Sequence, residues 1–210
     1  MRWVVLSNEM LREELLSNGV APDIEITWTG DVGEFARYKD ADVYVDLLFD
    51  NTKKRIELLN KFSPRLMIIN FVAGTLADIN APFIRINAWP GFLKRQVVEA
   101  SCGNEFLRKN AERVFNCLNK RTEWVPDVPG FITARVIAMM INEAWFALEE
   151  GVSTKEEIDT AMKLGTNYPY GPFEWGDQIG IKNVCALLDT LSKTNDRYQP
   201  ASLMKKQVIA

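Results

Sequence analysis

The sequence contains no histidine in 210 residues. Histidine is the usual general base near neutral pH and the usual partner of serine and cysteine nucleophiles. It is also a common zinc ligand. Its absence excludes Ser-His and Cys-His catalysis and most zinc sites, so we predict no metal site. Any catalytic mechanism must work without an imidazole.

Cysteine, net charge and long apolar runs are also scarce. The three cysteines, Cys102, Cys117 and Cys185, lie far apart in the sequence and form no C-x-x-C pair. This argues against a disulfide framework and predicts a reducing compartment. The net charge is −3 and the sequence has no basic patch, which argues against a nucleic-acid partner. Because no apolar run is long enough for a membrane span or a signal peptide, we predict a cytosolic protein.

Short apolar runs alternate with helical patterns through residues 1–126. Strands are predicted at 2–7, 24–29, 41–49, 65–70, 82–87 and 122–126, and helices at 9–18, 52–62 and 103–120. Asn8 is the predicted cap of the first helix, and Asp50 or Asn51 that of the second. Strands that alternate with helices predict an α/β fold with a mostly parallel sheet covered on both faces.

The periodicity changes after "DVPG" at 127–130. Apolar residues then recur with a helical period, and helices are predicted at 131–151, 153–165 and 179–193. Thr154 and Glu157 have the spacing of a capping box, and Gly165 is the predicted end of that helix. We therefore predict two domains, an α/β domain at 1–126 and an all-helical domain at 127–210.

Four motifs follow one another in the helical half: "DVPGFITARV", "NEAWFALEEGV", "EEIDTAMKLG" and "YPYGPFEWGDQIG". Their order resembles the helical domain of the 3-hydroxyacyl-CoA dehydrogenase family, and no single packing requirement dictates all of these residue types together. The resemblance implies a trimmed Rossmann-like domain at 1–126. It also implies that residues 127–210 form a C-terminal domain of that family's type, which supplies a homodimer interface and part of an acyl-CoA cleft.

The first half resembles the same family in "ADVYVDLLFDNTKKR" and "RINAWPGFLKRQVVEA". In that family, a histidine takes the proton of the 3-hydroxyl while hydride passes to NAD, and a glutamate about twelve residues later orients the histidine. Glu99 matches the glutamate, and Asn87 stands at the histidine position. The family's asparagine near the thioester carbonyl corresponds to Ala134. The resemblance thus implies catalytic positions at these three residues, NAD as cofactor and an acyl-CoA or related ligand.

The sequence departs from the family where the cofactor would bind. "LSNEMLREELL" at 6–16 has no glycine, whereas the family carries G-x-G-x-x-G, which lets a pyrophosphate approach a helix N-terminus. The second predicted strand ends in Trp28 and Thr29 instead of an acid for the ribose hydroxyls. An amide at Asn87 does not accept a proton near pH 7. Because losing general-base catalysis costs roughly 10²–10⁴ in rate, we predict weak or no NAD-dependent dehydrogenase activity.

Three hypotheses stay open at this point. The chain is a catalytically degenerate member that still binds an acyl-CoA or a partner, an oxidoreductase on a hydroxyacyl substrate that uses Glu99 as base, or a homodimeric structural or regulatory module. In an alternative interpretation, Glu99 is only a surface residue on a strand. The run Lys53–Arg55, with Asp46 and Asp50, is interpreted as a solvated strand end and helix start.

Overall fold

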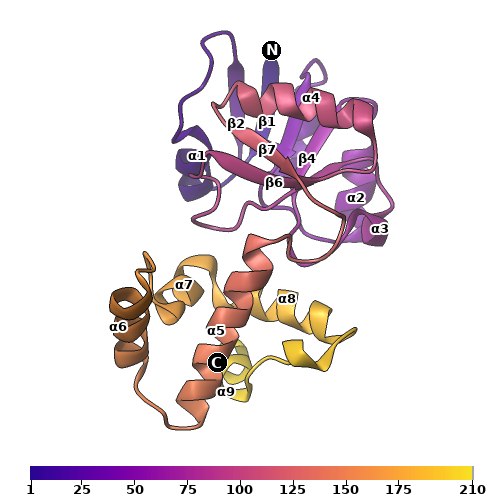
Figure 1. The fold of residues 1–210 in the computed structure, drawn as a ribbon. Coiled ribbons are helices and arrows are strands. Elements are labelled where there is room, and N and C mark those ends of the chain that lie inside the picture. The colour runs from indigo at the N-terminus through magenta and orange to yellow at the C-terminus, as the bar shows by residue number, and fades with distance from the viewer. Residues whose placement is uncertain (210) are drawn as a thin grey trace. The chain divides into compact units, whose positions relative to one another are not determined.

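The computed structural model describes residues 1–209, and the chain divides into two compact units, Met1–Phe131 and Ile132–Ala210. Figure 1 draws both units as ribbons and labels many of their helices and strands. The predicted domain boundary lies between residues 126 and 127, a few residues before this division, and it stays a prediction. Each unit is described by itself below.

The first unit contains a seven-stranded sheet in the order β2-β1-β3-β4-β5-β6-β7. The strands are β1 (Arg2–Leu6), β2 (Glu25–Thr29), β3 (Val43–Asp46), β4 (Leu66–Asn70), β5 (Ile84–Ile86), β6 (Val97–Ser101) and β7 (Arg121–Trp124). Every neighbouring pair is parallel except β5 and β6, which are antiparallel. This confirms the predicted α/β class. Strand β6 was not predicted, because Glu99 interrupts its short apolar run.

Helices cover both faces of the sheet (Figure 1). Helices α1 (Glu9–Leu16) and α4 (Glu105–Asn116) pack on one face, and η1 (Val32–Arg37), α2 (Lys53–Asn60) and α3 (Leu76–Ile79) pack on the other. Alternate residues of one strand supply the two cores, because successive side chains point to opposite faces. In β1, Trp3 and Val5 belong to the first core, whereas Val4 and Leu6 belong to the second.

The helix caps confirm one sequence prediction and correct another. The side-chain oxygen of Asn8 accepts a hydrogen bond from Leu11 N at 2.9 Å, so Asn8 caps α1 as predicted. Helix α2 is capped by Thr52, so the prediction of Asp50 or Asn51 was wrong. Asp50 instead accepts hydrogen bonds from the backbone N and the hydroxyl of Thr52, and so holds the true cap in place.

A buried arginine holds residues 127–131, the last segment of the first unit, against the sheet. Arg85 in β5 is fully buried, and its Nε donates to Asp127 Oδ1 at 3.0 Å. Its other nitrogens donate to the backbone oxygens of Phe71, Gly74 and Val128. The guanidinium also stacks 4.1 Å from the ring centroid of Phe131. A buried charge is tolerated only when it is paired and hydrogen-bonded, so this set of contacts fixes residues 127–131 on the sheet.

The described residues of the second unit form helices joined by short loops and contain no strand. It contains α5 (Thr133–Glu149), α6 (Lys155–Thr166), α7 (Pro172–Ile179), α8 (Ile181–Ser192), η2 (Asp196–Tyr198) and α9 (Ser202–Ile209). Helix α5 packs against α7, α8 and α9. The capping box of Thr154 and Glu157 is confirmed. Gly165 does not end α6, which continues to Thr166 and ends at Asn167 in the left-handed conformation.

Residues 167–180, a connector rich in aromatic side chains, contain helix α7. Asp159 of α6 caps the N-terminus of that helix. The buried carboxylate of Asp159 accepts hydrogen bonds from Phe173 N at 2.8 Å and Glu174 N at 3.1 Å. Negative charge at a helix N-terminus is stabilising. The cap position itself is Gly171, and a Cβ added there would lie 2.2 Å from the carboxyl group of Asp159. Gly171 of the motif "YPYGPFEWGDQIG" therefore leaves room for Asp159 of the motif "EEIDTAMKLG".

We expect Gly171→Ala to lower the free energy of unfolding by about 1–3 kcal/mol, because the methyl group displaces the Asp159 carboxylate from the helix N-terminus. Gly165→Ala is the matched control in α6. Nothing lies within 4 Å of its added Cβ, so stability stays equal or rises by up to about 1 kcal/mol. Urea unfolding of the two variants measures the difference. Equal stability of Gly171→Ala and wild type would contradict this account of the connector.

Candidate functional site

Polar side chains gather where the parallel strands end. Thr29, Asp46 and Asn70 are the last residues of β2, β3 and β4, and Asn87 directly follows β5. In open α/β sheets, ligands bind beyond the carboxyl ends of the strands, beside the point where the strand order reverses. Here that point lies at β1, which has β2 on one side and β3 on the other. The candidate site is therefore built around the carboxyl edge of the sheet.

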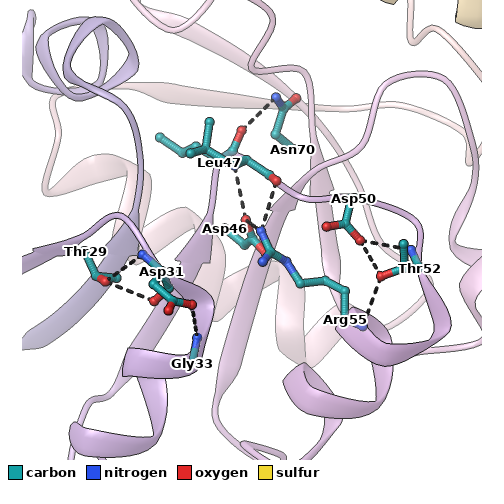
Figure 2. Close-up of polar contacts among 10 residues, drawn as sticks. Thr29, Asp31, Gly33, Asp46, Leu47, Asp50, Thr52, Arg55 and Asn70 are labelled. Atoms are coloured by element: carbon teal, nitrogen blue, oxygen red, sulfur yellow. Dashed lines mark hydrogen bonds and ion pairs between the residues drawn. The ribbon is translucent and has the colours of Figure 1, made fainter.

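Asn70 ties together the turns that follow β3 and β5. Its Nδ2 donates to Leu47 O at 3.1 Å and to Ala88 O at 3.2 Å, and its Oδ1 accepts from Ala88 N at 3.0 Å. Figure 2 shows its contact with Leu47. Asn70 was not predicted as a site residue, although a polar residue at the end of the apolar run "RLMIIN" indicates the end of a strand near a site. By fixing Ala88, Asn70 also fixes the backbone next to Asn87.

The structure brings Asn87 and Glu99 together. Asn87 N donates to Glu99 O at 3.1 Å, next to the antiparallel pairing of β5 and β6. The side chains also meet, since Asn87 Nδ2 donates to Glu99 Oε2 at 2.9 Å. The two residues are 3% and 9% exposed. Glu99 lies on a strand, but the interpretation that it is a surface residue was wrong.

Ala134, the third predicted site residue, lies in the first turn of α5 in the second unit and is fully buried. Its methyl side chain has no hydrogen-bonding atom, so it offers no amide to a thioester carbonyl. Its place in a site with Asn87 stays a prediction.

The turn between β1 and α1 is occupied by the protein's own polar groups. The Asn8 side chain takes the backbone N–H of Leu11, and the Ser7 hydroxyl donates to Asn8 O at 2.8 Å. Glu9 adds a carboxylate to the first turn. A helix N-terminus attracts anions through its free N–H groups and its dipole. The side-chain cap and the acidic residue both reduce that attraction.

A carboxylate does stand near the end of β2, although the strand's own last residue is Thr29. The Thr29 hydroxyl bonds the carboxylate of Glu34, which comes from η1 and also pairs with Arg37 at 2.8 Å. Asp31 N donates to Thr29 Oγ1 at 3.1 Å, and Asp31 caps η1 through Gly33 (Figure 2). The sequence analysis missed Glu34 because it considered only the strand's final residues.

A buried ion pair closes the end of β3. The Asp46 side chain is fully buried, and Arg55 contacts it through Nε at 2.8 Å and Nη2 at 3.2 Å (Figure 2). Burial raises the pKa of Asp46 to about 6, although the charge of Arg55 opposes the rise. The interpretation as a solvated strand end was wrong for Asp46 and Arg55. It holds for Lys53 and Lys54, which are exposed.

The described chain offers neither a metal site nor a membrane-spanning helix. Within residues 1–209, no group of three or more histidine, cysteine, aspartate or glutamate side chains is arranged to hold a metal ion. Over the same residues, no helix has both the length and the apolar character needed to cross a membrane.

The family model described as the C-terminal domain of 3-hydroxyacyl-CoA dehydrogenase matches residues 130–210. A probable 3-hydroxybutyryl-CoA dehydrogenase of Bacillus subtilis is 39% identical over 186 residues, which cover 81% of this chain and 65% of the relative. Its counterpart in Deinococcus radiodurans is 29% identical over 201 residues, which cover 88% of this chain and 71% of the relative. These matches support membership of the 3-hydroxyacyl-CoA dehydrogenase family.

The fold agrees with this assignment. The crystal structure of (S)-3-hydroxybutyryl-CoA dehydrogenase from Ralstonia eutropha superposes with a TM-score of 0.76 at 21% identity, and the match covers 99% of this chain and 93% of that one. The predicted order, a Rossmann-like parallel-sheet part followed by a helical part of the family's C-terminal type, is confirmed. The chain spans less than two thirds of the length of most of the curated relatives that it matches.

The buried ion pair of Asp46 and Arg55 should make the stability of the protein depend on pH. The native pKa of Asp46 lies above its ordinary value of 3.8, so between about pH 4 and pH 6 the folded protein holds a proton that the unfolded chain has lost. Stability from this group is therefore greatest below pH 4 and falls as the pH rises to 6. The difference between the two pKa values corresponds to about 3 kcal/mol at most.

We expect Asp46→Asn to remove this fall from the pH dependence of urea unfolding. Asp50→Asn is the control, because the Thr52 hydroxyl lowers the pKa of Asp50 and its contribution has the opposite sign. A carboxyl titration of Asp46 near pH 4 by NMR would contradict the raised pKa.

Proposed function

We propose that this chain is a 3-hydroxyacyl-CoA dehydrogenase-like protein with little or no NAD-dependent dehydrogenase activity, and that it retains a binding site for an acyl-CoA or related ligand. The observation that carries the proposal is the hydrogen bond from Asn87 Nδ2 to Glu99 Oε2. An amide donates here and has no basic atom that accepts a proton near pH 7. A substrate hydroxyl at this position therefore meets no imidazole base.

The residues around β1 and α1 do not fit a dinucleotide held in the family's usual way. When bound, NAD supplies the acceptor for hydride, and its pyrophosphate needs bare backbone at a helix N-terminus. In this chain Asn8 fills that turn and Glu9 adds negative charge. Glu34 offers a carboxylate near the ribose position, but it already bonds Thr29 and Arg37.

The proposed ligand follows from the relatives. Those from Bacillus subtilis and Deinococcus radiodurans are both named as probable 3-hydroxybutyryl-CoA dehydrogenases. Residues 130–210 match the family's C-terminal domain throughout, so this half keeps the architecture while Ala134 lacks the family's amide. We infer binding of an acyl-CoA or a related small molecule with altered contacts at the thioester.

A second candidate function is oxidation of a hydroxyacyl substrate with Glu99 as the base. The observation in its favour is the placement of a buried carboxylate next to the position of the family's base. The same hydrogen bond weakens this candidate, because the Asn87 amide already occupies Glu99 Oε2.

We also propose that the protein is a homodimer formed through the helical unit. Helix α5 is apolar on both faces. Ile137 and Ile141 are buried, whereas Val136 and Ile132, the residue just before the helix, are 55% and 56% exposed. Exposed apolar side chains that lie one helical turn apart are typical of an interaction surface.

The activity prediction concerns NADH formation from 3-hydroxybutyryl-CoA. We expect wild type to be at least about 10²–10⁴-fold slower than the Bacillus subtilis relative, because the base is absent. Asn87→His restores an imidazole next to Glu99 but leaves the β1–α1 turn unchanged, so it stays inactive. Circular dichroism verifies that the variant is folded.

The other outcomes of this assay discriminate between the hypotheses. Wild-type turnover comparable to that of the relative would contradict both the base and the cofactor arguments. Activity in Asn87→His alone would support the base argument and refute the cofactor argument. Wild-type activity that Glu99→Gln abolishes would favour the second candidate function.

For the dimer, we expect Val136→Asp to weaken self-association about tenfold or more, because it places a charge within an apolar interface. Val152→Asp is the control, since Val152 is 68% exposed and follows α5. Sedimentation equilibrium measures both variants. A wild-type protein that stays monomeric at micromolar concentrations would rule out the proposed dimer.

A further inference from the structure

A cavity of about 470 Å³ opens at the amino edge of the sheet, away from the strand ends described above. Two segments of its wall place it there, because Lys39 shortly precedes β3 and Arg65 directly precedes β4. The cavity belongs entirely to the first unit. It plays no part in the proposed function.

The floor of the cavity is apolar and aromatic. Tyr44 of β3 is buried, and its ring centroid lies 4.6 Å from that of Phe62. The Tyr44 hydroxyl donates to Tyr38 O at 2.8 Å, so its polar end is already satisfied. Leu58 of α2 adds a half-buried aliphatic wall. Such a floor suits a flat or apolar group of a ligand.

The rim of the cavity is cationic. Lys39, Lys61 and Arg65 line it and are exposed, and no aspartate or glutamate belongs to its lining. Within residues 1–209, none of these three cations forms an ion pair. The neighbouring acid, Asp40, pairs instead with Arg2 at 3.9 Å. Three unpaired like charges around one hollow attract a multiply charged anion.

We propose that this cavity binds a small phosphomonoester that carries an aromatic or apolar group. The guanidinium of Arg65 offers the planar pair of donors that matches phosphate, and the two lysines add point charges. A monocarboxylate would neutralise only one of the three cations. The aromatic floor gives the organic part of the ligand a surface that inorganic phosphate alone does not use.

The test is an NMR titration of the whole chain with phenyl phosphate, and with phenol and inorganic phosphate as separate probes. We expect phenyl phosphate to shift amide signals of residues 36–44 and 58–66, and to bind more tightly than either fragment. Shifts confined to the carboxyl edge of the sheet would overturn the proposal. Equal affinities for phenyl phosphate and inorganic phosphate would also overturn it. So would the absence of amide shifts at phenyl phosphate concentrations up to about 10 mM, because a dissociation constant above that value does not indicate a specific site.

Charge-removing variants test the rim directly. Lys61→Gln and Arg65→Gln should each weaken phenyl phosphate binding by about two- to fivefold, the upper part of the range for one exposed ion pair. Lys54→Gln is the matched control, because Lys54 is an exposed lysine of α2 that does not line the cavity. Unchanged affinity in both rim variants, or an equal loss in the control, would overturn the proposal.

Discussion

The antiparallel pairing of β5 and β6 is the constraint on which the candidate site depends. It is the single reversal in an otherwise parallel sheet among the described residues, and it sets Ile86 opposite Ala100. One residue further along, Asn87 faces Glu99 through both backbone and side chain. One residue earlier, Arg85 enters the core, where it holds residues 127–131. A single register thus positions both the Asn87–Glu99 pair and residues 127–131.

The polar groups at the carboxyl edge of the sheet are partnered by other groups of the protein. Asn70 bonds the turns after β3 and β5, Asp46 pairs with Arg55, and Asn87 bonds Glu99. Satisfied polar networks in a low dielectric are rigid and specify one arrangement. A general base requires a protonatable atom, which the Asn87 amide lacks. The pair therefore keeps a buried hydrogen bond without a base at Asn87, in line with the proposed loss of dehydrogenase activity.

Much of the fold was predictable from periodicity, because strands buried on both faces and amphipathic helices leave different patterns. Local caps such as Asn8 and the Thr154–Glu157 box were also predictable, since they depend on residues a few positions apart. Strand β6 was not, because Glu99 interrupts its short apolar run. Contacts between distant segments, such as Asp159 with the cap of α7, leave no local signal. Glu34 lies beyond the last residues of β2, where the acid was expected, and Asn70 was missed although it ends the apolar run "RLMIIN".

The pairing of Asn87 with Glu99 was predicted only from the spacing of twelve residues in the resembled family. The register of β5 and β6 explains how residues twelve positions apart come to lie opposite each other. We propose that this chain lacks a usable nicotinamide site beside that pair. Calorimetric titration of the protein with NADH is the decisive measurement, with the Bacillus subtilis relative as the positive control. We expect an affinity at least about 100-fold below that of the relative, because the pyrophosphate loses its backbone cradle. Micromolar NADH binding comparable to that of the relative would contradict it.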